Sequence, residues 1–137
     1  MPLFLHEREA HKTLIEMLKP LKKDLPKTVI HCFTGTGEEL AEYIDMGFFV
    51  GVTGWLCDER RGSHLKDLIN LIPLDKIMVE TDAPYLIPRV SALKNSQRNE
   101  PKFLPHIVKE VVKNRKESKK LIISSMYLNS IEFFNLA

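Results

Sequence analysis

Short apolar runs alternate with segments of helical periodicity along the whole chain. Four apolar runs lack the polar alternation of a half-exposed strand, and they lie at Leu3–Leu5, Thr28–Ile30, Phe48–Val52 and Ile77–Val79. Between these runs, apolar residues recur three or four positions apart, as they do in Ala10, Leu14, Leu18 and Leu21. The pattern predicts four β-strands, each followed by a helix.

Local signals mark where the first two helices begin and end. Pro20 and Pro26 close the first helix. Thr36 and Glu39 have the spacing of a capping box at the start of the second, and Gly47 stands where a left-handed helix terminus is expected. These signals predict the second helix between Thr36 and Gly47.

The last third of the chain carries a polar loop and two further helices. The loop includes the polar stretch Ser91 to Pro101, and Pro105 suits a first helical position. In the final helix the periodicity predicts that six residues form one stripe: Ile123, Met126, Tyr127, Ser130, Ile131 and Phe134.

Strict alternation of strand and helix predicts an α/β fold with a parallel sheet and right-handed crossovers. A (β/α)8 barrel needs eight such units and usually about 250 residues. Four units in 137 residues correspond to half of such a barrel, and a small doubly wound sheet stays open as the alternative.

Composition describes one ordinary globular domain, with 44% apolar residues, 28% charged residues and a net charge of +2. No block of like charge indicates a partner. Cys32 and Cys57 form no CxxC pair, which favours a reducing compartment. The apolar runs are far shorter than the ~20 residues of a membrane span, so we expect a cytoplasmic protein without membrane contact, and a nuclear pool stays open for a eukaryotic source.

Three residues with metal-binding side chains each follow a different predicted strand: His6, His31 and Asp82. The carboxyl ends of parallel strands are where α/β folds build their sites. Imidazole nitrogen and carboxylate oxygen suit a divalent ion such as Zn²⁺ or Mn²⁺, and Asp82 could also accept a proton from a metal-bound water. The alternative is that each histidine and Asp82 only caps a strand or loop through hydrogen bonds.

Five strings in order carry a resemblance to a known family: FLHEREAH (Phe4 to His11), HCFTGTGEE (His31 to Glu39), GVTGWLCDERRG (Gly51 to Gly62), ETDAPYLIPR (Glu80 to Arg89) and RNEP (Arg98 to Pro101). Together they closely resemble the TatD family of metal-dependent deoxyribonucleases, over practically the whole chain. Long strings in a fixed order are a specific signal. The resemblance implies an amidohydrolase-like fold, a barrel of the TIM type.

The resemblance also implies a site and an activity. The family's fifth-strand and sixth-strand histidine ligands match His6 and His31, and its eighth-strand aspartate matches Asp82. The implied cofactors are divalent metal ions, Mg²⁺, Mn²⁺ or Zn²⁺. The implied reaction is 3′-to-5′ exonuclease hydrolysis of single-stranded DNA, with RNA as a further substrate and a role in DNA repair.

The chain departs from the family pattern at its start. TatD-like enzymes carry an HxH metal pair on their first strand and a glutamate on their fourth, and no HxH occurs here. We therefore expect residues 1–137 to be a single partial domain, the carboxyl-terminal half of the barrel with strands five to eight. An open half barrel exposes two sheet edges, which favours self-association.

Three functions stay open from the sequence. The first is the TatD-like nuclease, and the second is an interaction or regulatory half without activity. The third is an amidohydrolase-type enzyme with a substrate other than nucleic acid, because one fold hosts many chemistries.

Several side chains near the predicted site have weaker signals. The candidates for binding the nucleic-acid backbone are Arg60, Arg61, Arg89, Lys94 and Arg98, because cationic groups pair with phosphate. Arg61 and Arg98 are favoured among them, although surface arginines are also commonly solvated. Trp55 could stack on a base or pack under a loop. Glu80 could orient a ligand, and Cys32 is assigned no catalysis.

Overall fold

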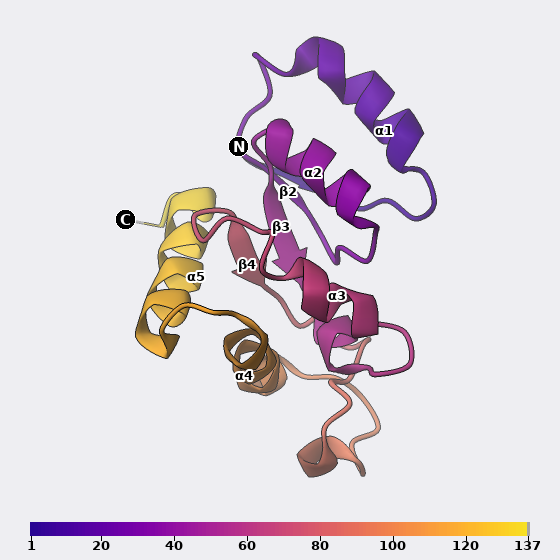
Figure 1. Cartoon of the computed structure of the whole chain (residues 1–137), viewed down its shortest axis with the longest axis vertical. Helices are drawn as coiled ribbons and strands as arrows, with labels where there is room; N and C mark the ends of the chain where they lie inside the picture. Colours follow the sequence, from indigo (N-terminus) through magenta and orange to yellow (C-terminus); the bar gives the residue numbers. More distant parts are fainter. Residues whose placement is uncertain (137) are drawn as a thin grey trace.

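A four-stranded parallel sheet forms the centre of the computed structural model, which describes residues 1–136 (Figure 1). Its strands are β1 (Leu3–Leu5), β2 (Thr28–Ile30), β3 (Phe49–Val52) and β4 (Ile77–Val79), and they lie side by side in the order of the chain. All three neighbouring pairs are parallel. A sequential order has no switch point, so the sheet is of the TIM-barrel type, and a doubly wound sheet is excluded for these strands.

Helices connect the strands as the periodicity predicts. They are α1 (His11–Leu18), α2 (Gly37–Asp45), α3 (Ser63–Leu68), α4 (Leu104–Asn114) and α5 (Lys119–Phe134), with short 3-10 turns η1 (Lys19–Leu21), η2 (Gly54–Cys57), η3 (Ser91–Leu93) and η4 (Pro101–Phe103). None of the helices in residues 1–136 is long and apolar enough to cross a membrane.

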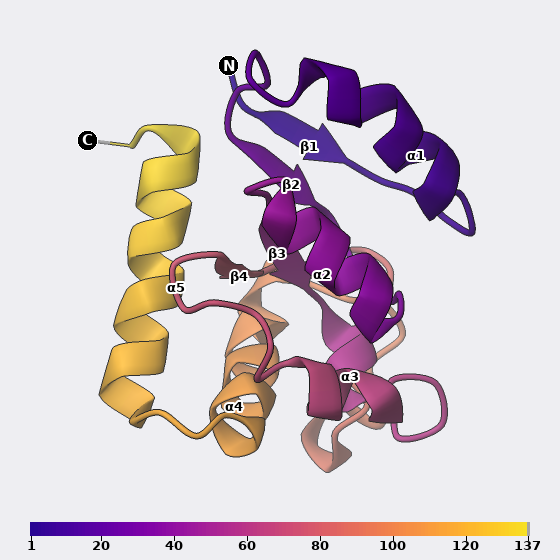
Figure 2. The ribbon, with the colours of Figure 1, turned by 45° about the horizontal axis from the view of Figure 1, so that its top comes forward.

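One face of the sheet carries the main core. Ile30, Val50 and Ile77 point to this face, where they pack with buried residues of all five helices. Side chains of a strand alternate between its two faces, so every second strand residue joins this core. Figure 2 shows α1 and α2 along this face, while α5 stands along β4.

The other face of the sheet is covered only in part. Val29, Phe49 and Met78 form a second, small cluster with Phe133 near the end of α5. Phe4, on the same face of β1, is 51% exposed, and its ring centroid lies 6.4 Å from that of Phe133. Helix α5 therefore passes the β4 edge, with its first half in the main core and its end on the second face.

The capping signals of α2 are confirmed. The Thr36 backbone N–H donates to the Glu39 carboxylate at 2.7 Å, and the Glu39 N–H donates to the Thr36 hydroxyl at 3.3 Å. Gly47 adopts a positive φ of 80° directly after the helix. Glycine reaches this backbone conformation without steric cost, so the chain turns here into β3.

The interior side of α5 differs from the predicted stripe: Met126 is buried and Ser130 and Ile131 are partly buried, but Ile123 is exposed. Tyr127 and Phe134 are exposed, whereas Ile122, Asn129 and Phe133 face the interior. The helix is apolar on several sides, so periodicity does not select one face. Asn129 selects it instead, because its side-chain amide donates to the backbone carbonyls of Leu74 at 2.8 Å and Ile77 at 2.7 Å.

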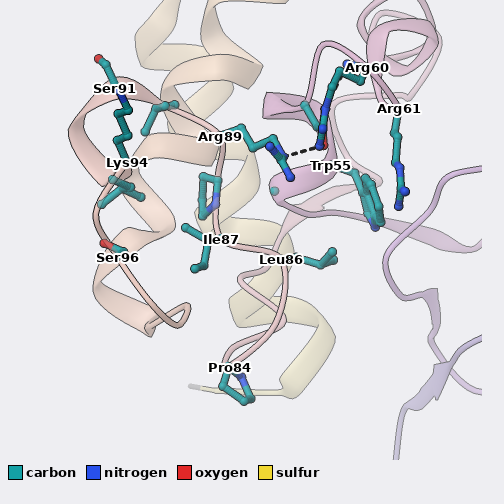
Figure 3. Close-up of a pocket in the computed structure, with 15 residues that line it drawn as sticks. Trp55, Arg60, Arg61, Pro84, Leu86, Ile87, Arg89, Ser91, Lys94 and Ser96 are labelled. Atoms are coloured by element: carbon teal, nitrogen blue, oxygen red, sulfur yellow. Dashed lines mark hydrogen bonds and ion pairs between the residues drawn. The ribbon is translucent and has the colours of Figure 1, made fainter.

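The polar loop between β4 and α4 faces the turn η2 and encloses a pocket with it (Figure 3). Pro84, Leu86 and Arg89 of the loop form one wall, and Trp55 and Arg60 form the other. The loop thus brings residues far apart in the sequence to the carboxyl edge of the sheet.

Candidate active site

Backbone hydrogen bonds continue the sheet ladder past the strand ends. The His31 N–H donates to the Leu5 carbonyl at 2.8 Å, and the Glu80 N–H donates to the Val52 carbonyl at 3.0 Å. The residues that follow β1, β2 and β4 therefore meet at one edge of the sheet. This places His6, His31 and Asp82 at the same edge, as their positions after the strands predict.

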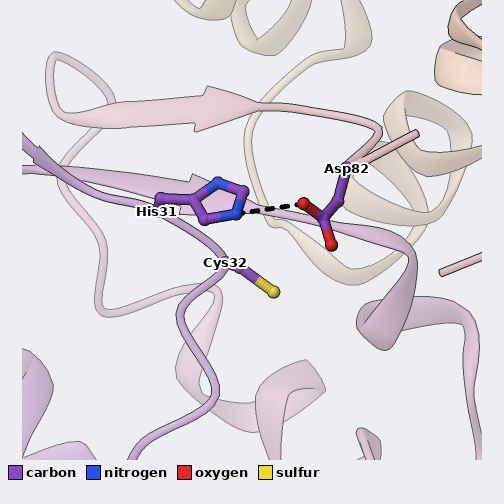
Figure 4. A group of neighbouring side chains, drawn as sticks. All are labelled: His31, Cys32 and Asp82. Atoms are coloured by element: carbon purple, nitrogen blue, oxygen red, sulfur yellow. Dashed lines mark ion pairs between the residues drawn. The ribbon is translucent and has the colours of Figure 1, made fainter. Parts of the chain in front are cut away.

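His31 lies between two carboxylates, and Figure 4 shows its contact with one of them, Asp82. Its Nε2 is 3.1 Å from Asp82 Oδ1, and its Nδ1 is 2.8 Å from Glu80 Oε2. The His31 side chain is only 17% exposed, so water competes little for these contacts. A carboxylate at one ring nitrogen orients the imidazole and makes the other nitrogen a better ligand. The Glu80 contact is a close ion pair without hydrogen-bond geometry, and it places a carboxylate at the ring nitrogen opposite Asp82.

Glu80 also joins the ends of β2 and β4. Its Oε1 accepts a hydrogen bond of 2.6 Å from the Cys32 backbone N–H. Cys32 itself adopts the left-handed conformation with a φ of 54°, and Asp82 does the same with a φ of 58°. A Cβ on Gly51 would collide with the Glu80 carboxylate, so glycine on β3 makes room for this contact. Backbone strain of this kind concentrates at functional sites.

His6 lies near this group but not within it. Its ring centroid is 5.7 Å from that of His31, and it lines a pocket of about 390 Å³ together with Cys32 and Asp82. Among the described residues, three side chains bring potential ligand atoms within 4.8 Å of one another: His31, Cys32 and Asp82. The structure therefore brings two of the three predicted ligands into contact and leaves the third beside them.

The donor set fits a divalent ion. His31 offers imidazole nitrogen, Asp82 offers carboxylate oxygen, and these suit Zn²⁺ or Mn²⁺. Burial raises the pKa of the Cys32 thiol to about 11, so without a metal the thiol is protonated at neutral pH. The metal-binding role of His6, His31 and Asp82 stays a prediction.

Asn99 holds the loop that carries Asp82, a role that the sequence analysis missed. Its side-chain amide donates to the carbonyls of Thr81 and Tyr85, both at 2.6 Å, and to that of Leu86 at 3.1 Å. Its own backbone N–H donates to the Pro84 carbonyl at 3.0 Å. Its place in the string RNEP was the only signal for it, because a buried asparagine needs partners that the sequence does not reveal.

The two predicted phosphate-binding arginines have different surroundings. The guanidinium of Arg61 lies 5.7 Å from the centre of the Trp55 ring, and both side chains line the pocket that contains Asp82. Arg98 is exposed and lines neither this pocket nor the larger one beside it. The geometry thus favours Arg61 as a substrate-binding residue, and both assignments stay predictions.

The parallel sheet and the side chains at its carboxyl edge together define a class of protein. It is the class of α/β proteins of the TIM-barrel type that have a histidine and carboxylates at this edge. Residues 1–135 match the family described as TatD related DNase. The chain belongs to the TatD family, which confirms the resemblance seen in its sequence.

Curated relatives show the same relationship. The chain is 49% identical to the 3′-5′ ssDNA/RNA exonuclease TatD of Pantoea ananatis and 50% identical to the protein of that name from Pantoea vagans. These matches cover 99% and 100% of this chain and 53% of each relative. The chain thus spans about half the length of the curated relatives it matches.

Solved structures agree with the fold. The TatD homologue YJJV from Escherichia coli matches all of this chain and 51% of its own, with a TM-score of 0.89 and 28% identity. A TatD family hydrolase from Entamoeba histolytica matches 97% of this chain and 50% of its own, with a TM-score of 0.80 and 26% identity.

Removing the charge of Glu80 should weaken metal binding. We expect Glu80→Gln to lower the affinity for Mn²⁺ about 10- to 100-fold, because the Glu80 carboxylate lies 2.8 Å from Nδ1 of the expected ligand His31. Isothermal titration of the two proteins with MnCl₂ measures this difference. Glu16→Gln, an exposed position on α1, is the control, and equal affinities for all three proteins would contradict the role of Glu80.

Cys57 should react slowly with alkylating reagents in the folded chain. Burial raises the pKa of its thiol to about 11, so at pH 8 the reactive thiolate is scarce. We expect iodoacetamide to modify Cys57 much more slowly in buffer than in guanidinium chloride, as measured by peptide mass spectrometry. Equal rates would show that the thiol is accessible and ionised.

Proposed function

We propose that this chain contributes to a divalent-metal-dependent nuclease that hydrolyses single-stranded DNA, and also RNA, from the 3′ end. The observation that supports this most is His31 held between Glu80 and Asp82 beside a pocket lined by Arg61. The names of the TatD relatives support the same substrates.

In this proposal His31 Nε2 and Asp82 Oδ1 would hold a divalent ion, with His6, which directly follows β1, as a further ligand. Such an ion polarises a phosphoryl oxygen and lowers the pKa of a bound water. Asp82 would accept the proton of the attacking water, because its carboxylate lies partly exposed at the pocket that admits the substrate. Glu80 would keep His31 in place, and Arg61 would bind a phosphate of the strand.

We propose further that the domain is the carboxyl-terminal half of a barrel, strands five to eight. Its sequential parallel sheet and its match to about half of each relative support this. Two-metal clamping of a phosphodiester would then need ligands from another polypeptide or segment.

Self-association follows from the same proposal. Within residues 1–136, β1 and β4 are the edge strands, each with a strand partner on one side only, and Phe4 on β1 is 51% exposed. We expect a molar mass that rises with protein concentration in size-exclusion chromatography with light scattering. Phe4→Lys should lower the molar mass measured at high concentration, whereas Met17→Lys, at an exposed position on α1, should leave it unchanged. A monomer at all concentrations would refute this expectation.

Release of nucleotides from a 3′-labelled single-stranded oligonucleotide tests the nuclease proposal. Purified chain is incubated with Mg²⁺ or Mn²⁺, and EDTA serves as the control. Release that requires the metal supports the nuclease. No release from a sample shown to be folded by circular dichroism would contradict it for this chain and favour the interaction half.

A further inference from the structure

A second, larger pocket adjoins the candidate active site. It has a volume of about 860 Å³ and lies between η2 with its following loop and the loop of residues 84–96 (Figure 3). Trp55, Arg61 and Leu86 line both this pocket and the one that contains Asp82. A ligand that occupies the site at Asp82 can therefore extend past Trp55 into the second pocket.

The second pocket has an excess of positive charge. Its lining includes Arg60, Arg61, Arg89 and Lys94, and Asp58 is the one carboxylate among its lining residues in the described chain. Concave surfaces lined by one sign of charge concentrate ligands of the opposite sign. The ligand expected here is an anion with several charges.

Asp58 orders two of these guanidinium groups. The residue is 5% exposed, and its Oδ2 lies 2.8 Å from Arg89 Nε and 3.3 Å from an Nη of Arg60. The hydrogen bond from Arg60 holds the pKa of Asp58 below its usual range, so the carboxylate stays charged. Arg60 contacts Asp58 with both its Nε and one Nη, each at 3.3 Å, which leaves its second Nη for a ligand. Arg89 uses only its Nε for this contact, and its two Nη groups have no ion-pair partner within residues 1–136.

The shape and the aromatic wall indicate which anion fits. Trp55 stands between the two pockets, and aromatic rings in such grooves stack on unpaired bases. A guanidinium group with both Nη atoms free, as in Arg89, binds phosphate through paired hydrogen bonds, and Arg60 can add one from its remaining Nη. A single strand of nucleic acid offers both groups at each nucleotide.

We propose that this pocket binds the nucleotides on the 5′ side of the bond to be cleaved, with phosphates at Arg60 and Arg89 and a base at Trp55. The inference rests on the proposed nuclease function and adds to it a dependence on strand length. A strand that is too short to extend beyond the first pocket gains no affinity from Arg89. A longer strand reaches Arg89 and binds more tightly.

Binding without metal tests this independently of hydrolysis. The probes are 5′-fluorescein-labelled oligothymidylates of two and six nucleotides, measured by anisotropy in EDTA with the 137-residue chain. We expect Arg89→Ala to weaken the hexamer about ten-fold and the dinucleotide less than two-fold. The slope of log affinity against log salt should fall by about 0.7, the value for one lost phosphate contact on a single strand.

Matched variants separate a binding role from a structural one. Arg60→Ala should reproduce the length-dependent loss, and Lys109→Ala, exposed on α4, should leave both affinities unchanged. The proposal would be overturned if the variants lost no affinity, if they lost affinity equally for both strand lengths, or if the salt slope stayed unchanged. If binding depends on strand length but no nucleotide is released, the binding role of this pocket is supported and the nuclease proposal is contradicted. If nucleotides are released but Arg89→Ala binds the hexamer as tightly as the unchanged chain, the nuclease proposal is supported and the role of this pocket is contradicted.

Discussion

Asp82→Asn is expected to lower nucleotide release from single-stranded DNA about a thousand-fold. Loss of a carboxylate that accepts a proton typically costs 10²- to 10⁴-fold in rate, and here the same carboxylate would bind the ion. Asparagine has the same shape and tolerates the left-handed backbone of Asp82, so the loop should keep its conformation. The measurement is the initial rate of release with Mn²⁺.

Metal binding gives this prediction a second readout. The neutral amide should also weaken the binding of Mn²⁺, which titration calorimetry detects even in a chain that releases no nucleotides. Asp75→Asn is the control, because Asp75 is exposed before β4, away from the carboxyl edge. Full activity and full Mn²⁺ affinity in Asp82→Asn would remove Asp82 from the site.

Asn99→Ala is expected to lower the free energy of unfolding by about 3 kcal/mol, because it leaves partly buried carbonyls without a donor. The carbonyls of Thr81 and Tyr85 would lose their bonds to the amide. Since this loop carries Asp82, any metal-dependent nucleotide release should fall as well. Urea denaturation measures the stability, and hydrogen exchange of residues 81–86 measures the order of the loop.

A neighbouring asparagine controls for the composition of the loop. Asn95→Ala changes an exposed residue of the same loop and should alter stability by less than about 0.5 kcal/mol. If Asn99→Ala unfolds at the same urea concentration as Asn95→Ala, the amide does not hold the loop as the structure indicates.

Local patterns predicted the strands and the helix caps because neighbouring residues decide them. The capping box of Thr36 and Glu39 needs only residues three positions apart, and Gly47 needs only its own backbone freedom. Helix α5 was the exception. Several of its sides are apolar, and the carbonyls of Leu74 and Ile77, more than fifty positions away, select the buried one through Asn129.

The sequence by itself determined the family, the order of strand and helix, and the three residues that follow the strand ends. It also contained the arginines near the site. Only the tertiary structure decided which groups meet: Glu80 reaches Cys32 across 48 positions, and Asn99 reaches Thr81 across 18. Periodicity describes one element at a time, whereas contacts between side chains depend on how the elements pack. Hence His31 and Asp82 touch, His6 stands beside them, and Arg98 lies outside both pockets.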